Sequence, residues 1–586
     1  MKGGEPLDQT IVTRHQAAKE NRKPHDRNAT LNLAFINDEQ WVAWDKETSN
    51  LRLLLPDKQK PRLISNLIKP RLKQEYGELT ALPPQFRVEC NTQERSKRTY
   101  YYLKDLWDRY GYEKEGKDAL LWADSTGTGY LKWYFDSGAG PLYGDVRAGD
   151  PIIVSRSHFN ISLDPFAKSI DEASYLFDDT IRSREYVKKK YGVEVSGNGD
   201  FLYASLWQGR VKHQNKIPPV VVTEYWERPN AEYPEGRLVI FSGSTELYSG
   251  PNPYGEIPYA MIRHTVSAGE AYGDTWVSSA RQVNVLYNRI RSDMLENSAK
   301  LGNPPLIAPM GAIQGDVEMG RGEIIKYNPL VAAGGKIDQL KIEPYPPQVV
   351  NTLLRLEQEM DELSGTSTKG GMPRGVRSAQ QFSALRDKEE LRRQTVMDEY
   401  RDAITAALNG VMRLGRRFST LPRYVQAGNE NLLIKPAEDI PPEALVKVKV
   451  ELKPNVPPEE EQKMLFSLLD RKIIQDPRPV MRMTRFGSQE EVFTDVDLAA
   501  SQQQREIRKL LQGESPPVEP WHNHPIHMVE LNRFRMSEEY ENLPDSVKAV
   551  FDQHGAMHQQ FLAPKEGIAN APGNPGPGIP PGVPGA

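Results

Sequence analysis

Five histidines near the C-terminal end of the chain are the side chains whose spacing most suggests chemistry. They are half of the ten histidines in the sequence: His522, His524, His527, His554 and His558. His554 and His558 stand four residues apart, so a helix would present both imidazoles to one metal ion. However, a glycine follows His554 at the position where a zincin motif requires glutamate. The pattern therefore favours a solvated or packed helical hairpin over a metal site.

No other signature of catalysis or nucleotide binding stands in the sequence. Lys369 follows a run of Gly, Thr and Ser, as in a phosphate-binding loop, but Gly370 takes the place of the Ser or Thr that such a loop needs. No serine lies in a Gly-x-Ser-x-Gly motif. The only cysteine, Cys90, excludes zinc sites that need several thiolates. We therefore predict a protein that is not an enzyme and holds no cofactor or metal. A metal-dependent nuclease built on the histidines is the enzymatic alternative.

One short segment is basic throughout. Residues 365–377 contain no acidic side chain and three basic ones, Lys369, Arg374 and Arg377. Such a cluster can contact phosphate groups without reading the base sequence, and these contacts weaken as salt rises. An ordinary exposed connector is the alternative interpretation of the same residues.

Four acidic residues stand just before this segment, near the end of a stretch in which the apolar period predicts a helix. They are Glu357, Glu359, Asp361 and Glu362. Two interpretations remain open: a solvated helix face, or a negatively charged wall that repels other anions.

Two helices that flank a β-containing insertion would position these charges. Apolar residues recur at three- and four-residue intervals over 276–301, which predicts an amphipathic helix that ends at a Gly-Asn-Pro-Pro sequence. Short strands and turns are expected over 304–346, and the helical period resumes over 348–363. After the basic segment, a long helix is expected over 378–418, with bends at its two glycines.

The segments before this region change in character along the chain. Residues 1–30 are polar and charged, which predicts a flexible arm. The apolar pattern over 31–117 indicates helices. Over 120–265 the pattern indicates strands separated by Gly, Pro, Asn and Asp turns, with one helix at about 169–191.

The C-terminal part alternates short strands with helices, which are expected at about 458–474, 490–511 and 526–560. Residues 564–586 are rich in Pro and Gly and cannot bury a core, so we expect a flexible tail.

Length and charge limit the class of protein. At 586 residues the chain exceeds the size of one hydrophobic core, so several structural regions are expected. The 75 basic and 79 acidic residues give a formal charge of −4, which argues against a tight, sequence-reading DNA-binding protein. Any DNA contact is therefore expected to be local or weak.

No stretch approaches the ~20 apolar residues of a membrane span, and the N-terminus has no signal-peptide core.

The order of these elements resembles the portal fold of tailed bacteriophages, and of short-tailed phages in particular. The likeness covers residues 31–560. It is carried by Leu-Ala-Phe-Ile-Asn-Asp-Glu-Gln-Trp at 33–41, Gly-Asp-Val at 144–146 with Ile-Ser-Leu-Asp-Pro at 161–165, and the segments 255–276, 297–305 and 365–390. The resemblance implies an α+β, ring-forming fold with a wing, stem helices, a small β-containing clip, a tunnel loop and an α-helical crown.

The resemblance also implies a division of the chain. The arm would be residues 1–30 and the tail 564–586; between them would lie the wing 31–275, stem helix one 276–301, the clip 302–346, stem helix two 347–364, the tunnel loop 365–377, the long kinked helix with a return to the wing 378–455, and the crown with C-terminal helices 456–563. Lys369, Arg374 and Arg377 would then face DNA, and the four acidic residues would line the tunnel wall.

The function that the resemblance implies is that of a virion assembly protein. About twelve copies would form a ring at one capsid vertex, assembled in the bacterial host cytoplasm, through which the genome is packaged and later ejected. The partners would be double-stranded DNA passing nonspecifically, the large terminase subunit, the major capsid and scaffolding proteins, and head-completion or tail adaptor proteins, with no membrane. Another virion structural protein, such as a tail adaptor, is the alternative.

Overall fold

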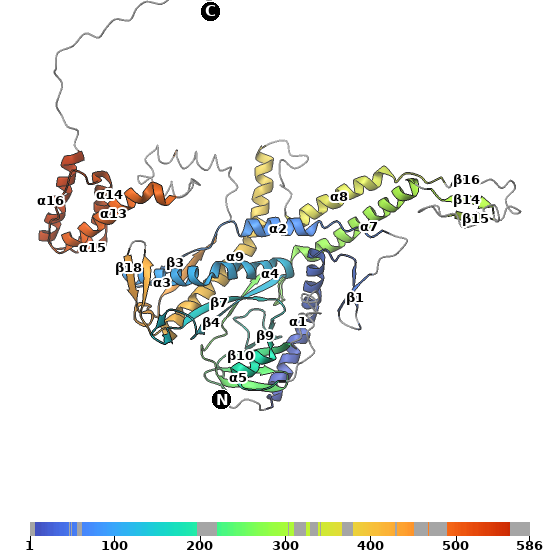
Figure 1. Cartoon of the computed structure of the whole chain (residues 1–586), viewed down its shortest axis with the longest axis horizontal. Coiled ribbons are helices and arrows are strands. Elements are labelled where there is room, and N and C mark those ends of the chain that lie inside the picture. The colour runs from blue at the N-terminus through green and yellow to red at the C-terminus, as the bar shows by residue number, and fades with distance from the viewer. Residues whose placement is uncertain are drawn as a thin grey trace, which may run out of the picture. The chain divides into compact units, whose positions relative to one another are not determined.

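The computed structural model describes two compact units, one within residues 1–454 and one within residues 455–586, each treated by itself below. The described residues are 6–45, 47, 50–54, 61–195, 219–302, 304–309, 324–327, 338–339, 341–365, 379–427, 430–450, 467 and 489–562. Helices and strands are labelled as in Figure 1. The fold is mixed α+β, as expected.

The first unit contains a long helix near its start, α1 (Gln9–Ile36), so the prediction of a flexible arm was wrong for residues 9–30. Its buried positions include Arg22, whose side chain is only 2% exposed. The Arg22 guanidinium donates to the backbone carbonyl of Ile161 at 2.8 Å and pairs with Asp26. Polar composition suggested solvent, but these polar groups are buried because strand residues far along the chain supply their partners.

Small helices and hairpins follow α1. They are β1 (Val42–Asp45) paired with β2 (Asn50–Leu53), then α2 (Ile68–Leu79), β3 (Gln85–Glu89), α3 (Gln93–Tyr110) and α4 (Tyr112–Thr126). Gly111 joins α3 to α4 with a φ of +62°, a left-handed conformation that glycine adopts at little cost. The prediction of helices within 31–117 is thus confirmed.

Strands dominate the next part of the unit, as the sequence predicted. Three form the sheet β13-β4-β7: β4 (Thr128–Asp136), β7 (Asp150–Ser157) and β13 (Tyr259–Arg263). Five form the antiparallel sheet β12-β11-β10-β9-β8: β8 (Ile161–Leu163), β9 (Tyr175–Ser183), β10 (Pro219–Glu227), β11 (Arg237–Ser242) and β12 (Thr245–Pro251). A small hairpin is made by β5 (Leu142–Tyr143) and β6 (Val146–Arg147).

The helix predicted over 169–191 is wrong for most of its length. Residues Tyr175–Ser183 form β9, paired along its length with β10, and only α5 (Arg184–Tyr191) is helical. Leu176 and Phe177 are fully buried. The strand forms because pairing on both edges and burial of these side chains outweigh the local pattern.

The helices that flank the insertion lie close to their predicted positions. They are α7 (Trp276–Gly302) and α8 (Pro347–Ser364). In Figure 1 the two helices run side by side toward the strands of the insertion. Between them, β14 (Leu306–Pro309), β15 (Ile324–Tyr327) and β16 (Asp338–Gln339) form a sheet with β14 in the middle. The helix–sheet–helix arrangement is therefore confirmed for the described residues.

The long helix α9 (Ala379–Phe418) carries the largest core of the unit. Its apolar stripe, which includes Tyr400, Ile404 and Leu408, is buried in a cluster with residues of α3, α4 and β4. The helix continues through Gly410 and Gly415, which were predicted as bends. An added Cβ there would overlap the Trp133 and Tyr102 side chains, so close packing explains both glycines.

The unit closes with β17 (Arg423–Ala427), β18 (Glu430–Ile434), α10 (Pro436–Asp439) and β19 (Leu445–Lys449). β19 pairs with β3, which lies more than 350 residues earlier. None of the helices in the described part of the chain is both long and apolar enough to cross a membrane.

The second unit is helical where it is described. It contains α13 (Gln489–Leu511), α14 (His524–Arg535), α15 (Glu538–Glu541) and α16 (Asp545–Leu562), around a core that includes Leu510, Leu531 and Phe551. The helix predicted over 526–560 is divided into three. The predicted helix at 458–474 lies outside the described residues except Ser467. The predicted tunnel loop, except Gly365, and the predicted C-terminal tail lie outside them as well.

Candidate functional site

Helices α7 and α8 form a pair in the first unit. The sequence analysis predicted functional residues on α8 and in the segment that follows it. Leu356 and Met360 of α8 are buried against Val283 and Tyr287 of α7, and Leu72 of α2 belongs to the same cluster. An apolar contact therefore holds α7 and α8 to α2.

The four predicted acidic residues of α8 divide into two kinds. Glu357 accepts a hydrogen bond from the Tyr287 hydroxyl at 2.7 Å. Burial and this hydrogen bond raise the pKa of Tyr287. Asp361 accepts from Arg71 of α2, at 2.8 Å from Nε and 2.6 Å from Nη2. These two carboxylates therefore join α8 to α7 and α2.

Glu359 and Glu362 are exposed along α8. Within the described residues neither carboxylate forms an ion pair, unlike Asp361, which pairs with Arg71. If any of the four predicted residues line a tunnel wall, Glu359 and Glu362 are the two whose side chains already face solvent.

The basic residues Lys369, Arg374 and Arg377 lie outside the described residues, but the residue at which their segment begins is described. Gly365 ends α8 in a left-handed conformation with a φ of +63°. From α9, Arg392 donates to the Glu362 carbonyl at 2.8 Å and Arg393 to the Gly365 carbonyl at 3.1 Å. Cations at a helix C-terminus are favourable because the last carbonyls lack helical partners. The segment therefore begins beside two arginines of α9, which the sequence analysis missed.

A polar ladder on α7 was also missed. Asn284, Asn288 and Ser292, spaced four residues apart, are buried and accept hydrogen bonds from backbone N–H groups of residues 67, 65 and 63 at 2.8–3.0 Å. The two amide NH2 groups donate to Gln40. The spacing was visible in the sequence as one helix face, but nothing local identified its distant partner.

A buried charge cluster fixes the start of α7. His264 Nε2 lies 3.2 Å from Glu75 of α2 and 3.3 Å from Asp124 of α4. The indole of Trp276, the first residue of α7, donates to Glu75 at 2.5 Å. Burial alone would lower the pKa of His264, but the two carboxylates raise it to about 9. The imidazolium is therefore the form that the folded protein favours at neutral pH.

The His264 cluster predicts how stability depends on pH. Because the pKa of His264 is about 9 in the folded protein and 6.5 is its ordinary value, the stabilisation is complete below pH 6.5 and is lost as pH rises from 6.5 through 9. We expect a loss of roughly 3 kcal/mol over this window, from about 1.4 kcal/mol per pKa unit. Urea unfolding of wild type and His264→Gln at several pH values would measure it. An equal slope in both proteins would contradict the assignment.

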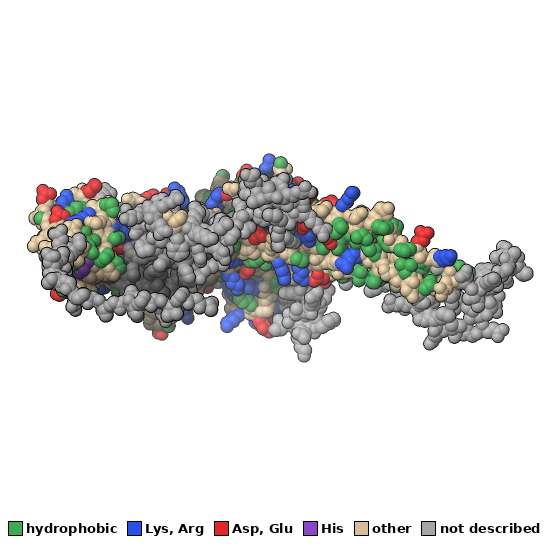
Figure 2. Space-filling model, turned by 90° about the horizontal axis from the view of Figure 1, so that it is seen from above, with side chains coloured by type: hydrophobic (Ala, Val, Ile, Leu, Met, Phe, Trp, Pro, Cys, Tyr) green, Lys and Arg blue, Asp and Glu red, His purple; other side chains and the backbone are tan. Residues whose placement is uncertain are grey.

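Apolar side chains are exposed on both helices. Leu286, Leu295 and Leu301 of α7 and Val350 and Leu354 of α8 are 40–45% exposed. Figure 2 shows hydrophobic side chains open to solvent over this pair of helices. An isolated exposed leucine is ordinary, but five along one helix pair form a surface that another protein surface would cover.

Comparison with known proteins identifies the family of this chain. A search of curated proteins found no match. The model of the family described as phage P22-like portal protein matches residues 12–433, which is more than half of the 586 residues and includes α1, both paired helices and α9. The resemblance seen in the sequence is thereby confirmed. The match supports a structural protein and does not support the alternative of a metal-dependent nuclease. The chain belongs to the phage P22-like portal protein family, a family of structural components of the virion.

Proposed function

We propose that about twelve copies of this chain form a closed ring at one capsid vertex, with α7 and α8 beside the central channel. The observation that carries the proposal is the row of apolar side chains that a single chain leaves exposed on α7 and α8. In a ring, the same surface on each subunit would meet the next subunit, which would bury these side chains.

The ring would act as the conduit for genome packaging and for DNA ejection. Under this proposal the large terminase subunit, the major capsid and scaffolding proteins, and head-completion or tail adaptor proteins bind its outer surfaces. The predicted names wing, stem, clip, tunnel loop and crown apply to the ranges given above. Support comes from family membership and from the helix–sheet–helix order in the described residues.

Electron microscopy of the purified chain would test this proposal. We expect closed rings with an axial hole wide enough for duplex DNA, and a mass in solution of about twelve chains. A smaller particle without a β-rich outer part would favour a tail adaptor instead. A compact monomer at every concentration would overturn the proposal.

The basic segment at 365–377 would contact the DNA as it moves through the ring. Each chain contributes Lys369, Arg374 and Arg377 without a nearby acidic residue in the segment, so a ring would present a positive band. Contacts of this kind hold phosphate without base specificity, which a moving duplex requires. The exposed Glu359 and Glu362 would supply the opposite charge beside the band.

Replacing Lys369, Arg374 and Arg377 together with alanine is therefore expected to leave rings intact but to reduce the yield of DNA-filled heads. Complementation of a phage that lacks its own copy would measure this yield. Replacing Lys168, Arg184 and Lys189, three exposed basic residues of the β-rich part, provides a control with the same loss of charge. Equal yields of DNA-filled heads from both triple variants would contradict the proposed contact between this segment and DNA.

A further inference from the structure

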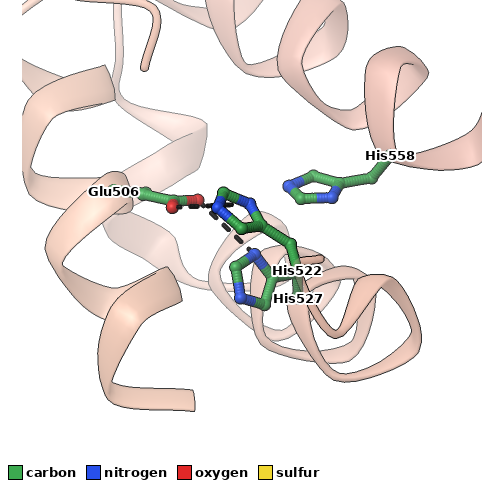
Figure 3. Close-up of side chains that lie close together, drawn as sticks. All are labelled: Glu506, His522, His527 and His558. Carbon is green, nitrogen blue, oxygen red and sulfur yellow. Dashed lines mark ion pairs between the residues drawn. The ribbon is translucent and has the colours of Figure 1, made fainter. Parts of the chain in front are cut away.

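The second unit brings five histidines and one glutamate into a single cluster. Glu506 comes from α13, His522 precedes α14, His527 lies on α14 and His558 on α16. Figure 3 shows these side chains converging from separate elements. Each offers one ligand atom, and the four atoms all lie within 4.8 Å of one another. All four residues are buried, with His527 and His558 fully inaccessible.

Several polar atoms of this cluster lack hydrogen-bond partners. Both ring nitrogens of His527 and the Oε2 atom of Glu506 are buried without one, within the described residues. His527 Nδ1 lies 3.5 Å from that oxygen, and His554 Nε2 lies 3.4 Å from it. Each buried polar atom without a partner costs about 1–3 kcal/mol, so a cluster of them needs an explanation.

The spacing of these atoms fits a shared metal ion. Ligand atoms about 2.1 Å from a tetrahedral ion lie roughly 3.4 Å from one another. The two distances to Glu506 Oε2 match this value, as does the 3.3 Å between His558 Nε2 and His554 Nε2. His522 Nδ1 is farther, 4.0 Å from the nearer Glu506 oxygen. One ion would satisfy several orphaned atoms at once.

Neighbouring groups orient the possible ligands, as residues around metal sites do. Gln502 of α13 bonds to His522 Nε2 at 2.9 Å. His524 Nδ1 lies 2.9 Å from His558 Nδ1, which leaves the other nitrogen of His558 directed into the cluster. His524 itself stacks on Phe561, with ring centroids 4.5 Å apart. The contacts with Gln502 and His524 therefore fix the orientation of the His522 and His558 rings.

We propose that Glu506, His522, His527 and His558 bind one divalent transition-metal ion, with His554 beside the site but not among the four ligands. Imidazole and carboxylate donors in a closed, four-ligand arrangement favour zinc in a structural role. The ion would join α13, α14 and α16, whose apolar core is small. The site lies beyond residues 12–433, outside the part of the chain that the family model matches. The proposal departs from the sequence analysis, which favoured packed helices without metal.

Metal analysis of the full-length chain, purified without a histidine tag, would test this inference. We expect about one zinc per chain, removal of that zinc by a chelator with a fall in the melting temperature of the second unit, and recovery on adding zinc. Cobalt added to the metal-free protein should give the visible absorption of tetrahedral coordination. Less than a tenth of an equivalent of metal, with no effect of zinc or cobalt, would overturn the proposal.

Two variants provide matched comparisons. Glu506→Gln keeps the size of the side chain but removes the only carboxylate ligand, so zinc affinity should fall at least tenfold, within the 10- to 100-fold scale of disturbed metal sites. His25→Gln, a histidine of α1 outside the cluster, should bind zinc as wild type does. Equal affinity in all three proteins would contradict the site. Because ring formation is measured separately, failure here leaves the proposed function unaffected.

Discussion

Gly129→Ala is expected to destabilise the first unit by about 3 kcal/mol or more, the upper range for overpacking. Gly129 lies in β4, where an added Cβ would overlap the backbone carbonyl of Ala119 in α4. Side chains can rotate away from an added methyl group, but this contact is with backbone, so the helix itself would have to move. The expected result is a large drop in the urea midpoint, or failure to accumulate as folded protein.

Gly77→Ala is the matched control for this substitution. Gly77 lies within α2, and an added Cβ there meets no atom within 4 Å. Alanine in a helix interior should stabilise by about 0.5–1 kcal/mol because glycine loses more backbone freedom on folding. Equal and small effects of the two substitutions, measured by urea unfolding, would show that α4 and β4 are not packed as closely as described.

Leu286→Glu combined with Leu354→Glu is expected to prevent ring assembly while the chain stays folded. Both leucines are exposed in the single chain, so each new carboxylate costs little before assembly. Within a ring, every subunit contact would bury unpaired charge, which is strongly unfavourable. A penalty of only about 1.4 kcal/mol per contact already lowers the association constant tenfold, and a closed ring repeats it.

The measurement is the mass in solution by light scattering, with electron microscopy of the same sample. Gln282→Glu with Gln358→Glu adds the same two charges to exposed polar positions of α7 and α8 and serves as the control. We expect the control to form rings and the leucine variant to remain monomeric with an unchanged circular dichroism spectrum. Rings formed equally by both would place the subunit contact elsewhere and remove the observation on which the proposed function rests.

The sequence by itself determined the elements whose signals are local. The bounds of α7, α8 and α9 were predicted to within a few residues because apolar periodicity and Gly-Pro stops act over one or two helical turns. The order of these helices around a β-containing insertion was enough to suggest the family, which the match over residues 12–433 confirmed.

Only the tertiary structure decided features that depend on partners far along the chain. The polar α1 is a packed helix because the sheet residue Ile161 accepts from Arg22, and β9 is a strand because β10 pairs with its whole length. The roles of Asp361 and of the His527 cluster likewise come from contacts with α2 and α13. A hydrogen bond or ion pair with a residue of another element leaves no periodic trace in the sequence. The same polar side chains therefore suggest exposure to solvent in the sequence, although they stabilise the fold in the structure.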